Sequence, residues 1–408
     1  MSPNVANLQI ADPSLQPSKN SMASEESYFV GKKILVIGRE SWFGPLLSKQ
    51  HIVLELCREN EVIYVEPFFH LGWLLKGKLP QQVYHEPYHQ LMPPSLTRLI
   101  PMRLPKSSTN KAARCWSEWL MLVQLWLKRF RPDVIISFSP YYAFLAKHWL
   151  APFVFYAVDT VETEEGTKSE ADTLAQADLV IAATEELYRR FKGKTHRLQY
   201  LPHGVSSTFL QTYAGKLPDD ILRVRQPRVG FVGAVSQVID IPLLIALAQA
   251  RPDYSIVLVG PYEKQSFGGG LTPEALASLK VLPNVHLLGP RLSSEMGTYI
   301  KGFDVGIIPY DLSHPRIHFS YHKVLQYMAL GKPVVTTCPA SLEVLPPHVG
   351  VGNTLATFLD AIDYAIHHYD DATAKACCDF AKMHSWEQRL IQLSKWLSDL
   401  VIRTEEAN

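Results

Sequence analysis

The sequence predicts a two-domain α/β protein in which each domain is a doubly wound parallel sheet, with a cleft between the two. Three observations support this fold class. The 408 residues exceed what one ordinary hydrophobic core accommodates. Short β-branched runs alternate with helical stretches in two separate parts of the chain. Apolar residues make up 47% and charged residues 19%, which is the balance of a packed globular chain.

The first domain is expected over residues 31–205, after a disordered tail at 1–30 that has no long apolar run. Its first strand begins at Lys33 with Ile-Leu-Val-Ile-Gly, and a helix follows to about Glu59. Continuous apolar runs of this kind are typical of parallel strands buried on both faces. Further strands are expected at 62–65, 134–138, 153–158 and 179–183.

The second domain is expected over residues 228–385 and begins with Arg228-Val-Gly-Phe-Val-Gly. Residues 206–227, which contain Ser, Gly, Pro and Asp, are interpreted as the linker. A final amphipathic helix at 386–408 carries leucines at helical spacing. Strands are expected at 255–259, 285–288, 305–308 and 333–336, and helices near 240–250, 294–301, 321–330 and 355–369.

The cysteines and the hydropathy pattern exclude several classes of protein. Five cysteines at irregular spacings form neither a disulfide framework nor a zinc ribbon, which favours a reducing, cytoplasmic location. The amino terminus does not have the pattern of a signal peptide. No stretch reaches the roughly 20 apolar residues that a membrane span requires. A net charge of +1 and the absence of a recognition motif argue against nucleic acid as a partner.

The most informative stretch is 303–336, where the strand FDVGIIPY ends at Tyr310, a polar loop follows, and YHKVLQYMALGKPVV then predicts a helix and a strand. The first turn of that helix, near Tyr321, offers free backbone N–H groups and the positive end of the helix dipole. Lys323 adds a cation suited to a phosphate, although a solvated surface lysine is the alternative interpretation. The pattern therefore predicts a site that suits a phosphate group.

This stretch resembles the donor-site signature of the group-1 family of retaining glycosyltransferases, and the segments RVGFVGAV, LPNVHLLGPR and LPHGV extend the resemblance. The resemblance implies a GT-B fold whose last helix returns to the first domain. It implies transfer of a hexose-type sugar, with retention of configuration, from a UDP- or GDP-sugar to a polysaccharide or glycolipid precursor. The nucleotide sugar is then a co-substrate, and neither a further cofactor nor a metal ion is expected.

On the donor side, the resemblance implies a phosphate-binding turn after the first strand of the second domain and a base-binding loop after 285–288. The side chain of Arg291, in the second of these, could equally be an ordinary surface group. The donor-binding residues expected in this way are Gly233, Ala234, Ser236, Gly289, Pro290, Arg291, Tyr310, Tyr321, His322, Val324 and Gln326.

The stretch 303–336 departs from the family pattern at three positions. Gln326 replaces the glutamate that holds the ribose hydroxyls, and His318 replaces a second glutamate that contacts the donor sugar. His322 stands where the family has proline. The spacing of the two histidines also fits a metal, but zinc is disfavoured because no third ligand is evident. We expect Lys323 and His318 to be catalytic, with a plain loop histidine as the alternative for His318.

On the acceptor side, Asp159 follows the run VFYAV and is expected to be catalytic as a polar contact to donor or acceptor, or else to cap the strand end. The loop Arg39-Glu-Ser-Trp-Phe-Gly resembles an acceptor loop, in which Gly44 would allow a bend. Trp42 could stack on a sugar or belong to the core. Two other functions stay open: a sugar-nucleotide 2-epimerase, which would need carboxylates in the cleft, and a non-catalytic nucleotide-sugar-binding relative.

A basic insert at about 71–131 carries ten Lys/Arg and only two Asp/Glu, together with several tryptophans. A basic and aromatic surface suits peripheral contact with the anionic inner face of a membrane, where lipid-linked acceptors would lie. A basic helix that packs by its apolar face is an equally good interpretation.

Overall fold

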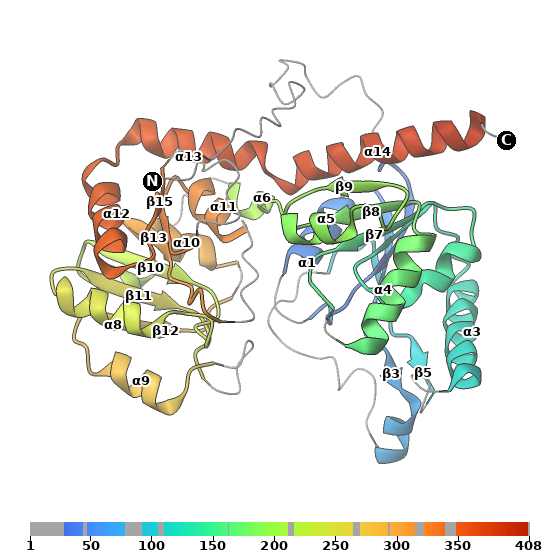
Figure 1. Cartoon of the computed structure of the whole chain (residues 1–408), viewed down its shortest axis with the longest axis horizontal. Helices are drawn as coiled ribbons and strands as arrows, with labels where there is room; N and C mark the ends of the chain where they lie inside the picture. Colours follow the sequence, from blue (N-terminus) through green and yellow to red (C-terminus); the bar gives the residue numbers. More distant parts are fainter. Residues whose placement is uncertain are drawn as a thin grey trace, which may run out of the picture.

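The computed structural model describes residues 28–43, 47–77, 92–104, 110–161, 163–210, 216–263, 270–292, 294–314, 322–338 and 348–406. Two parallel sheets form two domains that lie side by side (Figure 1). The predicted two-domain α/β fold is therefore confirmed. The central strands of both sheets are buried on both faces, as their unbroken apolar sequences require.

The first sheet has the strand order β4-β2-β1-β6-β7-β8-β9, and each neighbouring pair is parallel. Its strands are β1 (Lys33–Ile37), β2 (Glu61–Val65), β4 (Leu96–Leu99), β6 (Val134–Ser137), β7 (Phe153–Ala157), β8 (Leu179–Ala182) and β9 (Leu198–Tyr200). The two edge strands, β4 and β9, were not predicted, because both are short and only partly buried.

Helices cover both faces of the first sheet. They are α1 (Ser48–Leu56), α3 (Lys111–Leu127), α4 (Glu164–Gln176) and α5 (Glu185–Phe191), with the 3-10 segments η2 (Leu71–Lys76) and η3 (Pro140–Lys147). The side chains of Asn110, Thr163 and Thr184 accept backbone N–H groups at the starts of α3, α4 and α5. A small parallel pair joins β3 (Phe69–His70), just before the basic insert, to β5 (Met102–Arg103), within it.

The second sheet has the order β12-β11-β10-β13-β14-β15, again parallel throughout. Its strands are β10 (Arg228–Val232), β11 (Ser255–Val259), β12 (Val285–Gly289), β13 (Val305–Ile308), β14 (Val334–Thr336) and β15 (Val349–Val351). Its helices are α8 (Ile241–Ala250), α9 (Pro273–Lys280), α10 (Met296–Lys301), α11 (His322–Ala329), α12 (Leu355–His367) and α13 (Asp371–Met383). Strand order reverses between β10 and β13, and such a switch point is where open α/β sheets bind ligands.

Two boundary predictions were wrong. The segment expected to be a linker contains α6 (Ser207–Leu210) and α7 (Asp219–Leu222), and its Phe209 and Ile221 are buried in the second core. Phe29, expected in the disordered tail, is buried in the first core. Both segments bring large apolar side chains to a core, and this burial outweighs their polar surroundings in sequence.

The last helix, α14 (Trp386–Glu406), runs from the second domain back along the first (Figure 1). Its buried residues Trp386, Leu393, Leu397 and Leu400 belong to the first core. The two crossings between the domains lie side by side. The N–H of Val205 donates to the carbonyl of His384 and the N–H of Trp386 donates to the carbonyl of Val205, both at 3.0 Å.

Candidate functional site

Lys323, in the first turn of α11, reaches the carboxyl end of β10. Its Nζ donates to the carbonyl of Val232 at 3.0 Å, and a Cβ added to Gly233 would lie 2.3 Å from Nζ. The ammonium therefore lies directly over the glycine turn at the switch point of the sheet. Burial lowers the pKa of Lys323 to about 8. Lys323 is therefore a partly buried cation held against the carbonyl of Val232, rather than a solvated surface lysine.

The turn that follows β10 is held tightly by its neighbours. Gly233 has a φ of 142°, and a Cβ on Gly260, at the end of β11, would lie 1.9 Å from the carbonyl oxygen of Gly233. The backbones of the two strand ends therefore approach too closely for any side chain at Gly260. The N–H of Val232 donates to Oη of Tyr327 on α11 at 2.8 Å. This hydrogen bond ties the end of β10 to α11. Ala234 is half-buried there and Ser236 is buried.

The arginine of the loop after β12 forms hydrogen bonds to other residues of the protein. The guanidinium of Arg291 donates to Asp220 on α7 at 2.7 Å and to Oη of Tyr299 at 2.7 Å. It also donates to the carbonyl of Pro290 at 2.8 Å, and the carbonyl of Gly289 accepts the N–H of Gly260. The ion pair holds the Arg291 side chain against α7, so the backbone of this loop is the part that could contact a base.

Three other predicted donor-binding residues have defined surroundings. The side chain of Val324 is fully buried in the second core, so a donor contact at this residue is left to the backbone N–H of the first helical turn. Tyr310 is half-buried against the second core, and burial raises the pKa of its hydroxyl. Gln326 is half-buried, near the start of α11. His318, Tyr321 and Gly44 lie outside the described residues.

Asp159 lies at the carboxyl end of β7, within a group of charged side chains from three parts of the first domain. Its carboxylate is 3.8 Å from Arg39 and 4.0 Å from Lys49. Lys49 is itself buried and donates to both carboxylate oxygens of Glu40, at 2.7 and 2.6 Å. The Asp159 side chain remains 46% exposed, so this carboxylate lies beside two cations and is accessible to a ligand. Sequence reasoning did not identify Arg39 or Lys49 as its partners.

Two histidines meet at the junction of the domains. The ring of His203 lies 6.3 Å from that of His322 at the start of α11, and 6.0 Å from the ring of Trp386. Burial lowers the pKa of His203 to about 4 and that of His322 far below its usual range. Both imidazoles are therefore neutral at pH 7. The charges of Asp159 and Lys49 also bear on the pKa of His203, so the start of α11 faces the charged group of the first domain.

His203 was not predicted as a site residue, although it stands in the segment LPHGV that carries part of the resemblance. A lone histidine in a strand-like run gives no signal of its own. Only the placement of His322 opposite it, from a helix of the other domain, shows that the two belong together.

Trp42 is a core residue. Its side chain is 0% exposed and packs edge-to-face on Tyr64, with ring centroids 5.2 Å apart. Its backbone N–H donates to the buried carboxylate of Glu66, which Arg98 neutralises. The prediction that Trp42 contacts the acceptor is therefore wrong, because a buried indole cannot stack on a sugar.

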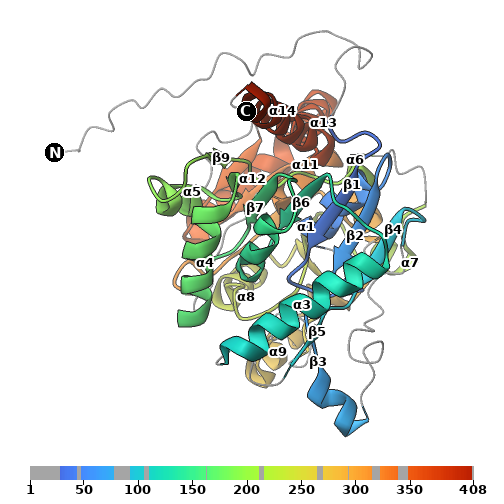
Figure 2. The same cartoon turned by 90° about the vertical axis from the view of Figure 1, so that its right-hand side faces the viewer.

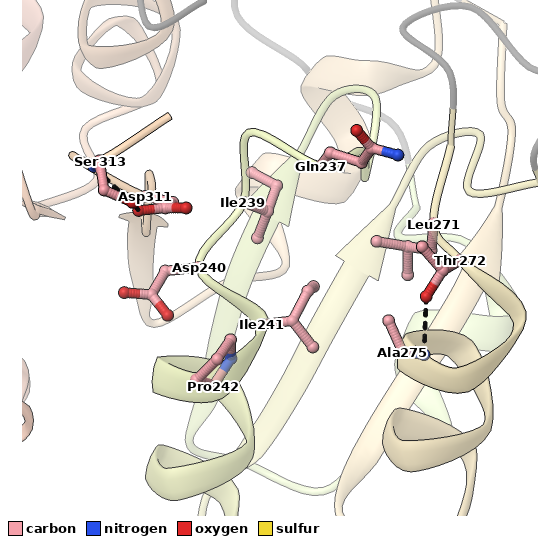
Figure 3. A pocket seen from close by; sticks show the side chains of 10 residues that line it. All are labelled: Gln237, Ile239, Asp240, Ile241, Pro242, Leu271, Thr272, Ala275, Asp311 and Ser313. Carbon is pink, nitrogen blue, oxygen red and sulfur yellow. Dashed lines mark hydrogen bonds between the residues drawn. The ribbon is translucent and has the colours of Figure 1, made fainter. Parts of the chain in front are cut away.

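A pocket of about 430 Å³ opens at the carboxyl edge of the second sheet, beside the starts of α8 and α9 (Figure 3). Its lining residues are Gln237, Ile239, Asp240, Ile241, Pro242, Leu271, Thr272, Ala275, Asp311 and Ser313. Asp240 accepts the N–H of Leu243 and so caps α8. None of the predicted site residues lines this pocket, and its polar groups serve local capping.

Within the described ranges, no group of three or more His, Cys, Asp or Glu side chains could hold a metal ion. Among the same residues, no helix combines the length and the apolar character needed to cross a bilayer.

Comparison with known proteins identifies the second domain. Residues 226–367 match the family model described as "Glycosyl transferases group 1". TuaH of Bacillus subtilis (strain 168), named as a teichuronic acid biosynthesis glycosyltransferase, is 24% identical over 238 residues. That alignment covers 56% of this chain and only 58% of the relative.

Solved structures show a similar fold over most of the chain. Anabaena Alr3699/HepE, in complex with UDP, superposes with a TM-score of 0.62 at 16% identity, covering 90% of this chain and all of that one. Sucrose-phosphate synthase from Thermosynechococcus elongatus superposes with a TM-score of 0.63 at 15% identity, covering 91% and 100%. The chain therefore has the GT-B fold, and most of its second domain matches the group-1 glycosyltransferase family model.

Proposed function

We propose that the protein transfers a hexose-type sugar from a UDP- or GDP-sugar to a polysaccharide or glycolipid precursor, with retention of configuration and without a metal ion. The observation that carries the proposal is the position of Lys323. Its ammonium lies over the Gly233 turn, in the first turn of a helix whose start faces the first domain. A cation, free helix N–H groups and a close backbone turn together suit a diphosphate.

The chemistry follows from what each group can stabilise. As the bond between sugar and diphosphate breaks, negative charge grows on the leaving phosphate oxygen, and Lys323 with the first turn of α11 stabilises that charge. The sugar becomes oxocarbenium-like, and Asp159 is the carboxylate that contacts donor or acceptor from the first domain. The ribose lies at Gln326, the base at the backbone of 289–291, and His318 beside the donor sugar.

The related proteins support the choice of substrates. Anabaena HepE has been solved with UDP, with UDP and glucose, and with UDP-glucose. TuaH is named for the synthesis of teichuronic acid, a polysaccharide. We further propose that the enzyme acts in the cytoplasm on a saccharide or lipid-linked acceptor, with peripheral contact at the inner face of the membrane.

Incubation of the purified protein with radiolabelled UDP- and GDP-hexoses tests the proposal. Slow release of free nucleotide from one donor, accelerated by a saccharide or lipid-linked acceptor and unaffected by EDTA, is the expected result. NMR of the product should show the anomeric configuration of the donor. Conversion of the sugar without nucleotide release would establish a 2-epimerase instead. Tight binding without turnover for every donor and acceptor would establish a non-catalytic relative.

Restoring the family's glutamate should strengthen donor binding. The charged oxygen of Gln326→Glu accepts a ribose hydroxyl more strongly than an amide does, by about 1 kcal/mol or roughly fivefold in Kd. Calorimetry with the preferred nucleotide measures this gain. The control is Gln249→Glu, an exposed glutamine in the last turn of α8, which should change nothing. An equal gain with a nucleotide that lacks both ribose hydroxyls would show that Gln326 does not contact the ribose.

A further inference from the structure

Helix α3 presents an apolar face to solvent. Its opposite face packs on the first core through Met121 and Leu125, which are buried. The outward face carries four large apolar side chains: Trp116 is 57% exposed, Trp119 51%, Trp126 75% and Leu127 68%. Their spacing of three, seven and one residues places them along one side of the helix. Three exposed tryptophans on one helix form an apolar surface that nothing in the described structure covers.

The surface around this face is strongly basic. From Lys111 to Arg131 the chain carries five cations, and Glu118 is the one acidic residue. Glu118 is half-buried, and against five cations this single carboxyl leaves a net formal charge of +4 over the segment. The cations are all exposed: Lys111, Arg114, Lys128, Arg129 and Arg131. A helix that lies flat on an anionic bilayer typically carries tryptophan along its length and positive charge at its ends, as α3 does.

The position of α3 leaves this face accessible. The helix lies on the outer side of the first domain, away from the second domain (Figure 1), and crosses the front of the molecule when that side is viewed directly (Figure 2). With 17 residues it is about 25 Å long. It can therefore contact a flat surface along its whole length without disturbing the junction between the domains.

We propose that the exposed face of α3 is the surface by which the protein binds anionic lipid. The indoles enter the headgroup region, while the cations at the two ends pair with lipid phosphates. A second copy of the chain is the weaker occupant, because a symmetric interface would set like charges against each other. The inference specifies the membrane contact of the proposed function, but it does not depend on the transfer chemistry.

Binding to vesicles tests this surface in the full chain. We expect sedimentation with vesicles that contain phosphatidylglycerol, much weaker binding to pure phosphatidylcholine, and loss of binding as salt rises. Trp116→Ser, Trp119→Ser and Trp126→Ser combined should abolish sedimentation. Lys128→Gln and Arg131→Gln should each weaken it about fivefold. The matched controls, Val281→Ser and Lys280→Gln, alter exposed residues of the second domain and should bind normally.

Cys115 supplies a direct probe of the same face, because it is the one exposed cysteine of the five, next to Trp116. An environment-sensitive fluorophore on Cys115, in a Cys378→Ser background, should shift to the blue with anionic vesicles. The same label on Lys280→Cys, in a Cys115→Ser background, should not shift. Equal binding of the tryptophan variant and the parent would overturn the inference. So would vesicle-independent dimerisation that the tryptophan variant loses, which would identify a second copy as the occupant.

The two proposals can fail separately. Donor hydrolysis without vesicles should be the same in the tryptophan variant as in the parent, since α3 lies outside the donor site. Donor hydrolysis without vesicle binding would contradict only the proposed lipid-binding surface. Vesicle binding without donor hydrolysis would contradict only the proposed glycosyltransferase activity.

Discussion

Replacing Lys323 by methionine should lower donor hydrolysis and sugar transfer by roughly 100- to 1,000-fold, which is the usual effect of removing one preorganised group that stabilises developing charge. The fold should not weaken, because a buried ammonium costs stability and methionine does not. Turnover assays and thermal unfolding measure the two effects. The control is Lys332→Met, since burial also lowers the pKa of Lys332, which lies beyond the far end of α11. Unchanged turnover in Lys323→Met would show that this residue is not part of the active site.

The same residue predicts a pH dependence. Burial lowers the pKa of Lys323 from 10.5 to about 8, so the ammonium is mostly present at pH 7 and is lost above pH 8. In the parent, kcat/KM should therefore fall as pH rises through about 8. Stability changes in the opposite sense. Between pH 8 and 10.5, Lys323 is protonated in the unfolded protein and deprotonated in the folded protein. The free energy of unfolding therefore rises with pH across that window, because the cost of burying the charge is lost. Lys323→Met should show neither effect.

Replacing Trp42 by alanine should destabilise the protein by about 3–5 kcal/mol, the usual cost of truncating a fully buried aromatic side chain. The indole fills the core between β1 and α1 and packs on Tyr64. Urea unfolding measures the loss. The control is Trp119→Ala, since that indole is exposed and its removal should stay within about 0.5 kcal/mol. A Trp42→Ala variant of normal stability with a raised acceptor KM would instead restore Trp42 as a sugar contact.

The elements that could be predicted from the sequence were those whose local residue pattern is compatible with only one structure. Unbroken apolar runs such as those that begin at Lys33 and Arg228 bury on both faces and so become central parallel strands. The pattern at 303–336 predicted a strand, a loop and a helix, and so placed Lys323 in the first turn of that helix. The first turn is where a helix has free backbone N–H groups.

The remainder depended on contacts between distant segments. A tryptophan in a loop can face a ligand or a core, and Trp42 is buried only because Tyr64 and Glu66 on β2 lie against it. Arg291 lies in the loop predicted to bind the base, yet its side chain forms an ion pair with Asp220, in the segment predicted to be a linker. His203 acquires a partner only when α11 of the other domain reaches it. None of these pairings leaves a local pattern in the chain.

The return of α14 has a consequence for how the protein is made. Trp386, Leu393 and Leu397 complete a core that otherwise comes from residues before Leu201. Domains usually fold one after another as they leave the ribosome, but this first domain must wait for the last helix to be translated. Until then, apolar groups around α1 lack their cover, so the nascent chain should occupy chaperones throughout translation of the second domain.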